Sequence, residues 1–135
     1  MQRVMKMLGG WGDLVFSVSE KQIKTFDNMK RSESARWTKH DIHGKKSKPE
    51  FLGEDLGKVT FDMLFSAQLG VNPMKEIDKL IKAERDGEAH MLIIGTKRFG
   101  LHKYYIASIN SDLNQFDNRG LLLSAKVNLT MEEYV

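Results

Sequence analysis

The segment that decides the fold reads Asn72-Pro-Met-Lys-Glu-Ile-Asp-Lys-Leu-Ile-Lys-Ala-Glu-Arg-Asp-Gly87. Its apolar residues recur at helical spacing and form one stripe of Met74, Ile77, Leu80 and Ile81. Asn72 can cap the first turn through its side-chain oxygen, and Pro73 suits the first helical position, where no N–H is needed. Gly87 can adopt the left-handed conformation that ends a helix. We therefore expect one amphipathic helix over about 72–86, packed by this stripe against a sheet.

The composition is that of an ordinary globular protein. The chain has 135 residues, of which 41% are hydrophobic and 29% charged, with a net charge of +3. This length predicts a single domain over residues 1–135. No apolar run approaches the roughly 20 residues that span a bilayer, so we expect no membrane insertion. The absence of cysteine excludes disulfides, thiolate nucleophiles and cysteine metal sites.

Three segments alternate as half-buried strands do, outside the helix. Lys58–Ser66 is the clearest, and its predicted inner face consists of Val59, Phe61, Met63 and Phe65. Leu14–Ser19 follows a glycine-rich turn and alternates in the same way. Leu121–Thr130 is expected to bury Leu121, Leu123, Ala125, Val127 and Leu129.

Further strands are less regular. Ile23–Met29 is expected to be one strand, and Lys103–Asn110 another. The continuous apolar run His90–Gly95 is typical of a strand covered on both faces. Ser111–Gly120 is mostly polar and is interpreted as a loop. About seven strands and one helix predict an α+β domain, with a strongly curved antiparallel sheet or barrel and the helix packed on it.

A long hairpin is expected at about 35–53. Ala35–Ile42 and Glu50–Leu52 flank the basic stretch His43–Pro49, which Gly44 and Pro49 mark as a loop. Neither strand alternates cleanly, and a hairpin with two wet faces is not stable alone, so it should contact another subunit or element. The candidate assembly-interface residues are Arg36, Trp37, Lys39, Lys45, Lys46 and Lys48.

Catalytic and metal chemistry find no support in the sequence. His40 and His43 lie three apart, so a strand would send them to opposite faces, and no third ligand is nearby. Asp13 follows a glycine turn and is expected to bond backbone N–H groups there. Gly9–Gly12 precedes a strand and lacks the Lys-Ser/Thr ending of a phosphate loop. Carboxylates that follow the helix without converging are Glu84, Asp86 and Glu88. We expect no enzyme activity, metal or cofactor.

The basic hairpin leaves two interpretations open. Its lysines could contact phosphates, with Trp37 as a stacking platform for bases, which would make a small nucleic-acid-binding domain. The other interpretation is a solvated tip, or a tip docked on an acidic neighbour. No nucleic-acid-binding motif accompanies it, and the helix is too mixed in charge to enter a groove, so we expect no specific nucleic acid.

Four stretches together resemble one family, the GpU-type tail proteins of contractile-tailed phages and related tail-like particles. The first is Met7–Phe16, and the second is Ser34–Trp37 followed by Pro49–Gly53. The others are Leu69–Pro73 with Gly87–His90, and Arg119–Val127 with the ending Glu132-Glu-Tyr134. The match is colinear from Met7 to Val135, and residues 1–6 lie before the family's typical start, as a flexible extension or an upstream start.

The resemblance implies a structural protein of the virion tail, assembled in the cytoplasm of the bacterial host. Such proteins are similar to the tail-tube fold and form rings, hexameric by expectation, where the tail tube meets the baseplate hub. The implied partners are further copies of the chain, the tail tube protein, the hub and neighbouring baseplate proteins, in a phage or a bacteriocin. The alternative within the family is a tail terminator or completion protein at the head-proximal end.

Overall fold

The first of two five-stranded sheets is built from both halves of the chain. The computed structural model describes residues 6–12, 14–18, 23–24, 26–95 and 97–135. In this sheet the antiparallel order is β10-β9-β1-β2-β3. Its strands are β1 (Lys6–Trp11), β2 (Leu14–Val18), β3 (Ile23–Lys24), β9 (Leu92–Ile94) and β10 (Lys97–Arg98).

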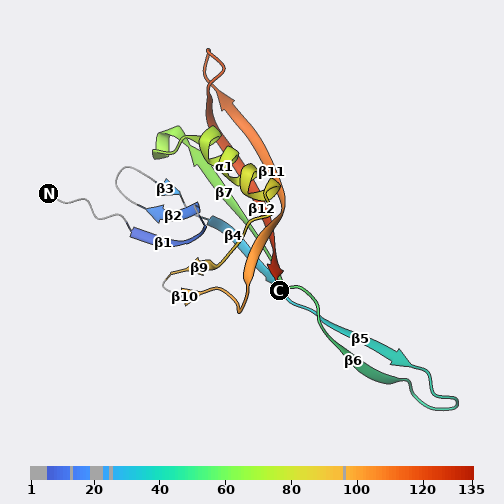
Figure 1. Ribbon diagram of the computed structural model, residues 1–135. Coiled ribbons are helices and arrows are strands. Elements are labelled where there is room, and N and C mark those ends of the chain that lie inside the picture. The colour runs from blue at the N-terminus through green and yellow to red at the C-terminus, as the bar shows by residue number, and fades with distance from the viewer. Residues whose placement is uncertain (1–5, 13, 19–22, 25, 96) are drawn as a thin grey trace.

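The second sheet is larger and curls into a half-barrel (Figure 1). Its antiparallel order is β4-β7-β12-β11-β8. The strands are β4 (Phe26–Ser32), β7 (Lys58–Ser66), β8 (Ala89–His90), β11 (Lys103–Phe116) and β12 (Leu122–Tyr134). A 3₁₀ turn, η1 (Ala67–Leu69), follows β7. The predicted α+β class with a strongly curved antiparallel sheet is confirmed.

The core lies between the two sheets and under the helix. The alternation predicted for β7 is confirmed, because its four inner residues are at most 1% exposed: Val59, Phe61, Met63 and Phe65. Phe16 of the first sheet packs edge-on against Phe26 and Phe61 of the second, with ring centroids 5.1 and 5.8 Å apart. Burying this many aromatic and branched side chains is the main term that stabilises the fold.

The single described helix, α1 (Pro73–Arg85), has the predicted caps. Asn72 accepts a hydrogen bond from the backbone N–H of Lys75 at 3.3 Å, and Gly87 has φ +65°. The buried face centres on Leu80, with Ile77 and Ala83 beside it. Met74 is 42% exposed, so its predicted burial is wrong. At about 100° per residue it lies about 120° around the helix from Leu80.

Two strand predictions fail because the chain changes sheets. Within Ile23–Met29, β3 belongs to the first sheet and β4 to the second. Within His90–Gly95, β8 and β9 likewise belong to different sheets. Only Leu92 of that run is fully buried, whereas Ile93 is 42% exposed. The predicted strand covered on both faces is therefore wrong.

The polar loop predicted at 111–120 is also wrong. β11 continues to Phe116 and pairs with β12 as far as Leu122, which leaves only a short turn. The outer part of β11, Ser111 to Phe116, is exposed, so pairing with β12 holds it in place without burial of its own side chains. Two register shifts beside the turn change the alternation. As a result Leu122 is buried, while Leu121, predicted to be buried, is 61% exposed.

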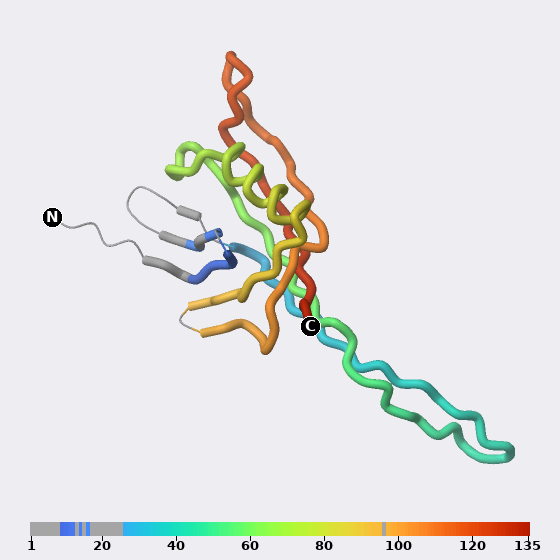
Figure 2. The backbone as a smooth tube through the Cα atoms, viewed as in Figure 1, coloured from blue at the N-terminus to red at the C-terminus, as the bar shows by residue number. Residues whose placement is uncertain are grey.

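The predicted hairpin at about 35–53 is confirmed as a separate two-stranded sheet of β5 (Ala35–His40) and β6 (Lys48–Glu54). We call residues 35–54 the arm. Figure 2 shows the arm reaching away from the rest of the molecule, from a root beside the C-terminal end of β12. No helix in the described part of the chain is long and apolar enough to cross a membrane.

Candidate assembly interface

The arm is the continuation of a hairpin that begins in the second sheet. Ser32 of β4 pairs with Lys58 of β7, and a few residues further out Ala35 pairs with Glu54. Between them the backbone N–H of Asp55 donates to the carbonyl of Ser34 at 2.9 Å. The pairing thus carries the two strands past the edge of the domain, where almost every side chain of the arm is exposed.

An exposed aromatic pair occupies one face of the arm. Trp37 and Phe51 are cross-strand partners with ring centroids 5.1 Å apart, and they are 58% and 52% exposed. Leu52, at the bulge beside them, is 53% exposed. Large apolar side chains clustered on a free projection are characteristic of a surface that another protein covers.

The register distributes the predicted interface residues over both faces of the arm. Trp37 and Lys39 share a face, because successive strand residues alternate. Arg36 lies on the opposite face, together with Lys48, which pairs with His40. Lys45 and Lys46 lie in the turn, where Lys45 donates to the carbonyl of Ile42 at 3.0 Å. We call Lys45, Lys46 and Lys48 the tip lysines.

The root of the arm is fastened to β12. Gly57 donates its N–H to Oε1 of Glu133 at 2.7 Å, and the N–H of Glu133 donates to the carbonyl of Gly57 at 3.0 Å. Nearby, Arg31 donates to Glu33 at 2.9 Å and stacks over the ring of Phe99 at 4.7 Å. The hydrogen bond to Glu33 raises the pKa of the Arg31 guanidinium. These contacts set the direction in which the arm leaves the sheet.

The second sheet has two different edges with little cover. β4 forms one edge, and β11 forms the other apart from its start, where β8 pairs with Tyr104 and Tyr105. From Ile106 to Phe116 no described strand lies outside β11. Unpaired backbone N–H and C=O groups on such edges can accept a strand from another chain.

A polar ladder crosses the solvent face of the same sheet. Asp62 of β7 accepts from Asn128 of β12 at 2.7 Å and from Asn28 of β4 at 3.2 Å. The hydrogen bonds from Asn128 and Asn28 hold the pKa of Asp62 below its usual value. Asn28 has φ +52° at the bulge of β4, so the ladder also holds an uncommon backbone conformation in place.

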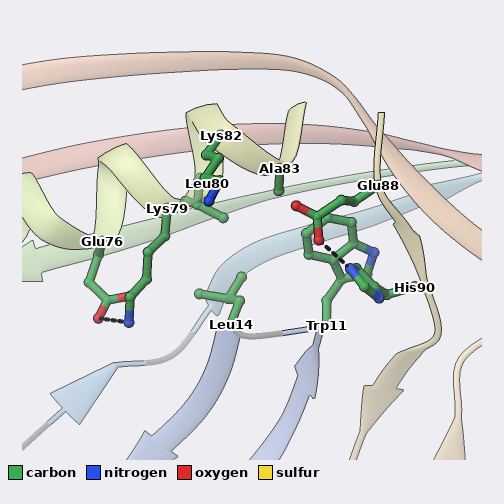
Figure 3. A pocket seen from close by; sticks show the side chains of 9 residues that line it. All are labelled: Trp11, Leu14, Glu76, Lys79, Leu80, Lys82, Ala83, Glu88 and His90. Atoms are coloured by element: carbon green, nitrogen blue, oxygen red, sulfur yellow. Dashed lines mark hydrogen bonds and ion pairs between the residues drawn. The ribbon is translucent and has the colours of Figure 1, made fainter. Parts of the chain in front are cut away.

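An open cavity of about 180 Å³ lies between α1 and the turn of β1 and β2 (Figure 3). Four of its polar side chains form two pairs: Lys79 lies 3.8 Å from Glu76, and His90 is hydrogen-bonded to Glu88 at 2.9 Å. Trp11 packs edge-on against His90 and donates its indole N–H to the carbonyl of Tyr104 at 2.9 Å. These contacts join the two sheets, which is a structural role.

Among the described residues, the remaining histidines and acids form no candidate metal centre. His40 ends β5 and is hydrogen-bonded to Glu50 across the arm, whereas His43 lies in the turn that follows. In the described ranges no group of three or more His, Asp or Glu side chains could hold a metal ion. The expectation for Asp13 concerns a residue outside the described ranges.

Sequence reasoning missed a second exposed apolar surface, at the turn of β11 and β12. Leu121 there is 61% exposed, and Met74 of α1 is 42% exposed. Between them is a hollow of about 600 Å³, which we call the helix hollow; it is lined by Asn72, Met74, Lys75, Asp78, Lys79, Lys82 and Leu121. The sequence hinted at this surface only through the lysines that recur at nearly every turn of the helix.

The comparison with protein families decides the affiliation. A family model described as Phage P2 GpU matches residues 12–135. The chain belongs to the Phage P2 GpU family. No curated protein matches it. The resemblance found in the sequence is confirmed, and membership of this family makes the chain a structural protein related to phage tails, and so a virion component that meets other tail proteins.

Proposed function

We propose that the chain forms a ring, hexameric in the simplest case, in a contractile phage tail or tail-like particle. The ring joins the tail tube to the baseplate hub and is required for tail assembly, which takes place in the host cytoplasm. The arm carries this proposal, because it presents Trp37, Phe51 and Leu52 to solvent and no part of the chain that the structure describes covers them. Its neighbours are further copies, the tube protein, the hub and adjacent baseplate proteins.

The sheet edges support ring formation. β4 and β11 lie at opposite edges of the second sheet. A contact between β4 of one copy and β11 of the next therefore joins two different surfaces and is heterologous. A heterologous contact repeats from copy to copy and closes into a ring when the rotation allows. Pairing these edges also removes the exposed strand edges that otherwise promote aggregation. We propose that residues 1–135 act in this ring as one domain.

Arm residues contact the adjacent subunit or ring, and the residues that we assign to this contact are Arg36, Trp37, Lys39, Lys45, Lys46 and Lys48. Buried aromatic and arginine side chains dominate the affinity of most protein interfaces. Charged groups at the rim contribute mainly to specificity and association rate, which is the role of the tip lysines.

Deletion of residues 44–48 tests this proposal. The variant should remain folded, because the deleted residues are exposed and far from the core, but it should fail to assemble with its tail partners. A matched variant replaces the same five residues by glycine and serine, which keeps the length and removes the charges. Normal incorporation of the deletion variant into complete particles would refute the arm's role. A cryo-electron map of the particle locates the ring, and density at the head-proximal end would refute the baseplate position in favour of a terminator.

A further inference from the structure

We propose that the arm of one copy lies along α1 of a second copy, with Glu50–Glu54 of β6 seated in the helix hollow. The inference rests on the proposed assembly role of the arm and names the surface that receives it. The occupant of the hollow is therefore a second copy of this chain.

Apolar side chains are matched on the two surfaces. The hollow presents Met74 and Leu121, which are 42% and 61% exposed. The middle of β6 presents Phe51 and Leu52, both more than half exposed. Docking covers all four at once and removes their exposed apolar surface from water, which favours association.

Charges at the hollow complement those of β6. Three lysines line it, Lys75, Lys79 and Lys82, against one acid, Asp78. The apolar pair of β6 is flanked by acids in the sequence Glu50-Phe-Leu-Gly-Glu54. Opposite charges around an apolar centre attract the two surfaces and help to fix the register of the contact.

The complementarity continues along both elements. Beyond Lys82 the helix ends at Arg85, and Asp86 caps it, so an acid lies at this end of the helix beside one exposed base. Beyond Glu50 the arm reaches Lys48 and the other tip lysines. From Lys82 to Asp86 is about 6 Å along a helix, and from Glu50 to Lys48 is about 7 Å along a strand, so the order and spacing of the charges agree. The negative C-terminal end of the helix dipole favours the basic tip in the same direction.

The contact must form between chains. The arm leaves the molecule at the C-terminal end of β12, whereas the hollow lies beside the β11–β12 turn at the opposite end (Figures 1 and 2). An arm cannot reach the hollow of its own chain. The contact joins two different surfaces of the chain, as the heterologous contacts of a ring do.

Cysteine cross-linking tests the pairing, because the natural sequence contains no cysteine. Full-length Leu52→Cys and Leu121→Cys chains of different tag size are mixed and oxidised. The inference predicts a disulfide-linked mixed dimer between the two variants. The matched control is Leu52→Cys with Leu101→Cys, because Leu101 is 82% exposed but far from the hollow, and this mixture should give at least tenfold less mixed dimer.

Charge reversal then tests the register. Glu50→Lys with Glu54→Lys in the arm chain should abolish the mixed dimer, and Lys79→Glu with Lys82→Glu in the partner should restore it. Equal cross-linking to Leu101→Cys, or no restoration, overturns the inference. If Leu52→Cys cross-links mainly to itself, the arm is an interface but the hollow is not its receptor, so the proposed function stands and this inference falls. Particles that assemble normally from a chain lacking the arm would overturn both.

Discussion

Leu80→Ala tests whether α1 is anchored through the face that the structure shows. Leu80 is 2% exposed and packs under the helix. Removing its outer carbons loses about 0.8 kcal/mol for each buried methylene-sized group, or about 2.4 kcal/mol in all. A further penalty normally comes from the cavity left behind. Leu80 already borders the open cavity beside Trp11 and Leu14, so water can enter the vacated space and the cavity penalty should be small.

We therefore expect Leu80→Ala to lower the free energy of unfolding by about 2–3 kcal/mol, near the lower end of the range of about 2–5 kcal/mol for such substitutions. Urea denaturation followed by circular dichroism measures it, with an unchanged m-value as the sign of two-state behaviour. Met74→Ala is the matched control and should change the stability by less than about 0.5 kcal/mol, because Met74 is 42% exposed. A Leu80→Ala loss below about 0.5 kcal/mol, or equal losses for the two variants, would refute this account of the packing.

Three further predictions follow from the sheets and the arm. The pKa of Asp62 is lowered in the folded state, so its contribution to stability is present above its ordinary value of 3.8 and is lost as the pH falls through the folded value. Below that pH, the free energy of unfolding should therefore fall less steeply with decreasing pH in Asp62→Asn than in the natural protein. Identical curves for the two proteins would contradict the ladder. Gly9→Ala should cost more than about 2 kcal/mol, because a Cβ there would lie 1.9 Å from the carbonyl oxygen of Ile93. Gly120→Ala, with φ +83° but open space, should cost only the left-handed strain of about 1–2 kcal/mol, and equal losses in thermal denaturation would contradict the clash. The tip lysines should bind duplex DNA weakly and without sequence preference in gel-shift titrations, and tight binding at physiological salt would instead favour the nucleic-acid interpretation.

The sequence alone determined the elements whose signals are local. The helix needs a cap, a proline and a closing glycine within a single stretch, and all three act as predicted at Asn72, Pro73 and Gly87. The inner face of Lys58–Ser66 followed from alternation, which reports burial directly when one face of a strand is covered. The arm followed from its loop punctuation and from the lack of clean alternation in its two strands. The family resemblance added the class of assembly, which no spacing of residues indicates.

Only the tertiary structure decided how the elements meet. Neighbouring residues within His90–Gly95 enter different sheets, and nothing local marks where the chain crosses. Phe51 joins the candidate interface because the register places it opposite Trp37, although the two are distant in sequence. The helix hollow unites Met74 with Leu121, a residue from another hairpin. Pairing and packing depend on contacts between distant segments, whose free energy is gained only after the chain has closed on itself, so the local pattern of residues does not contain them.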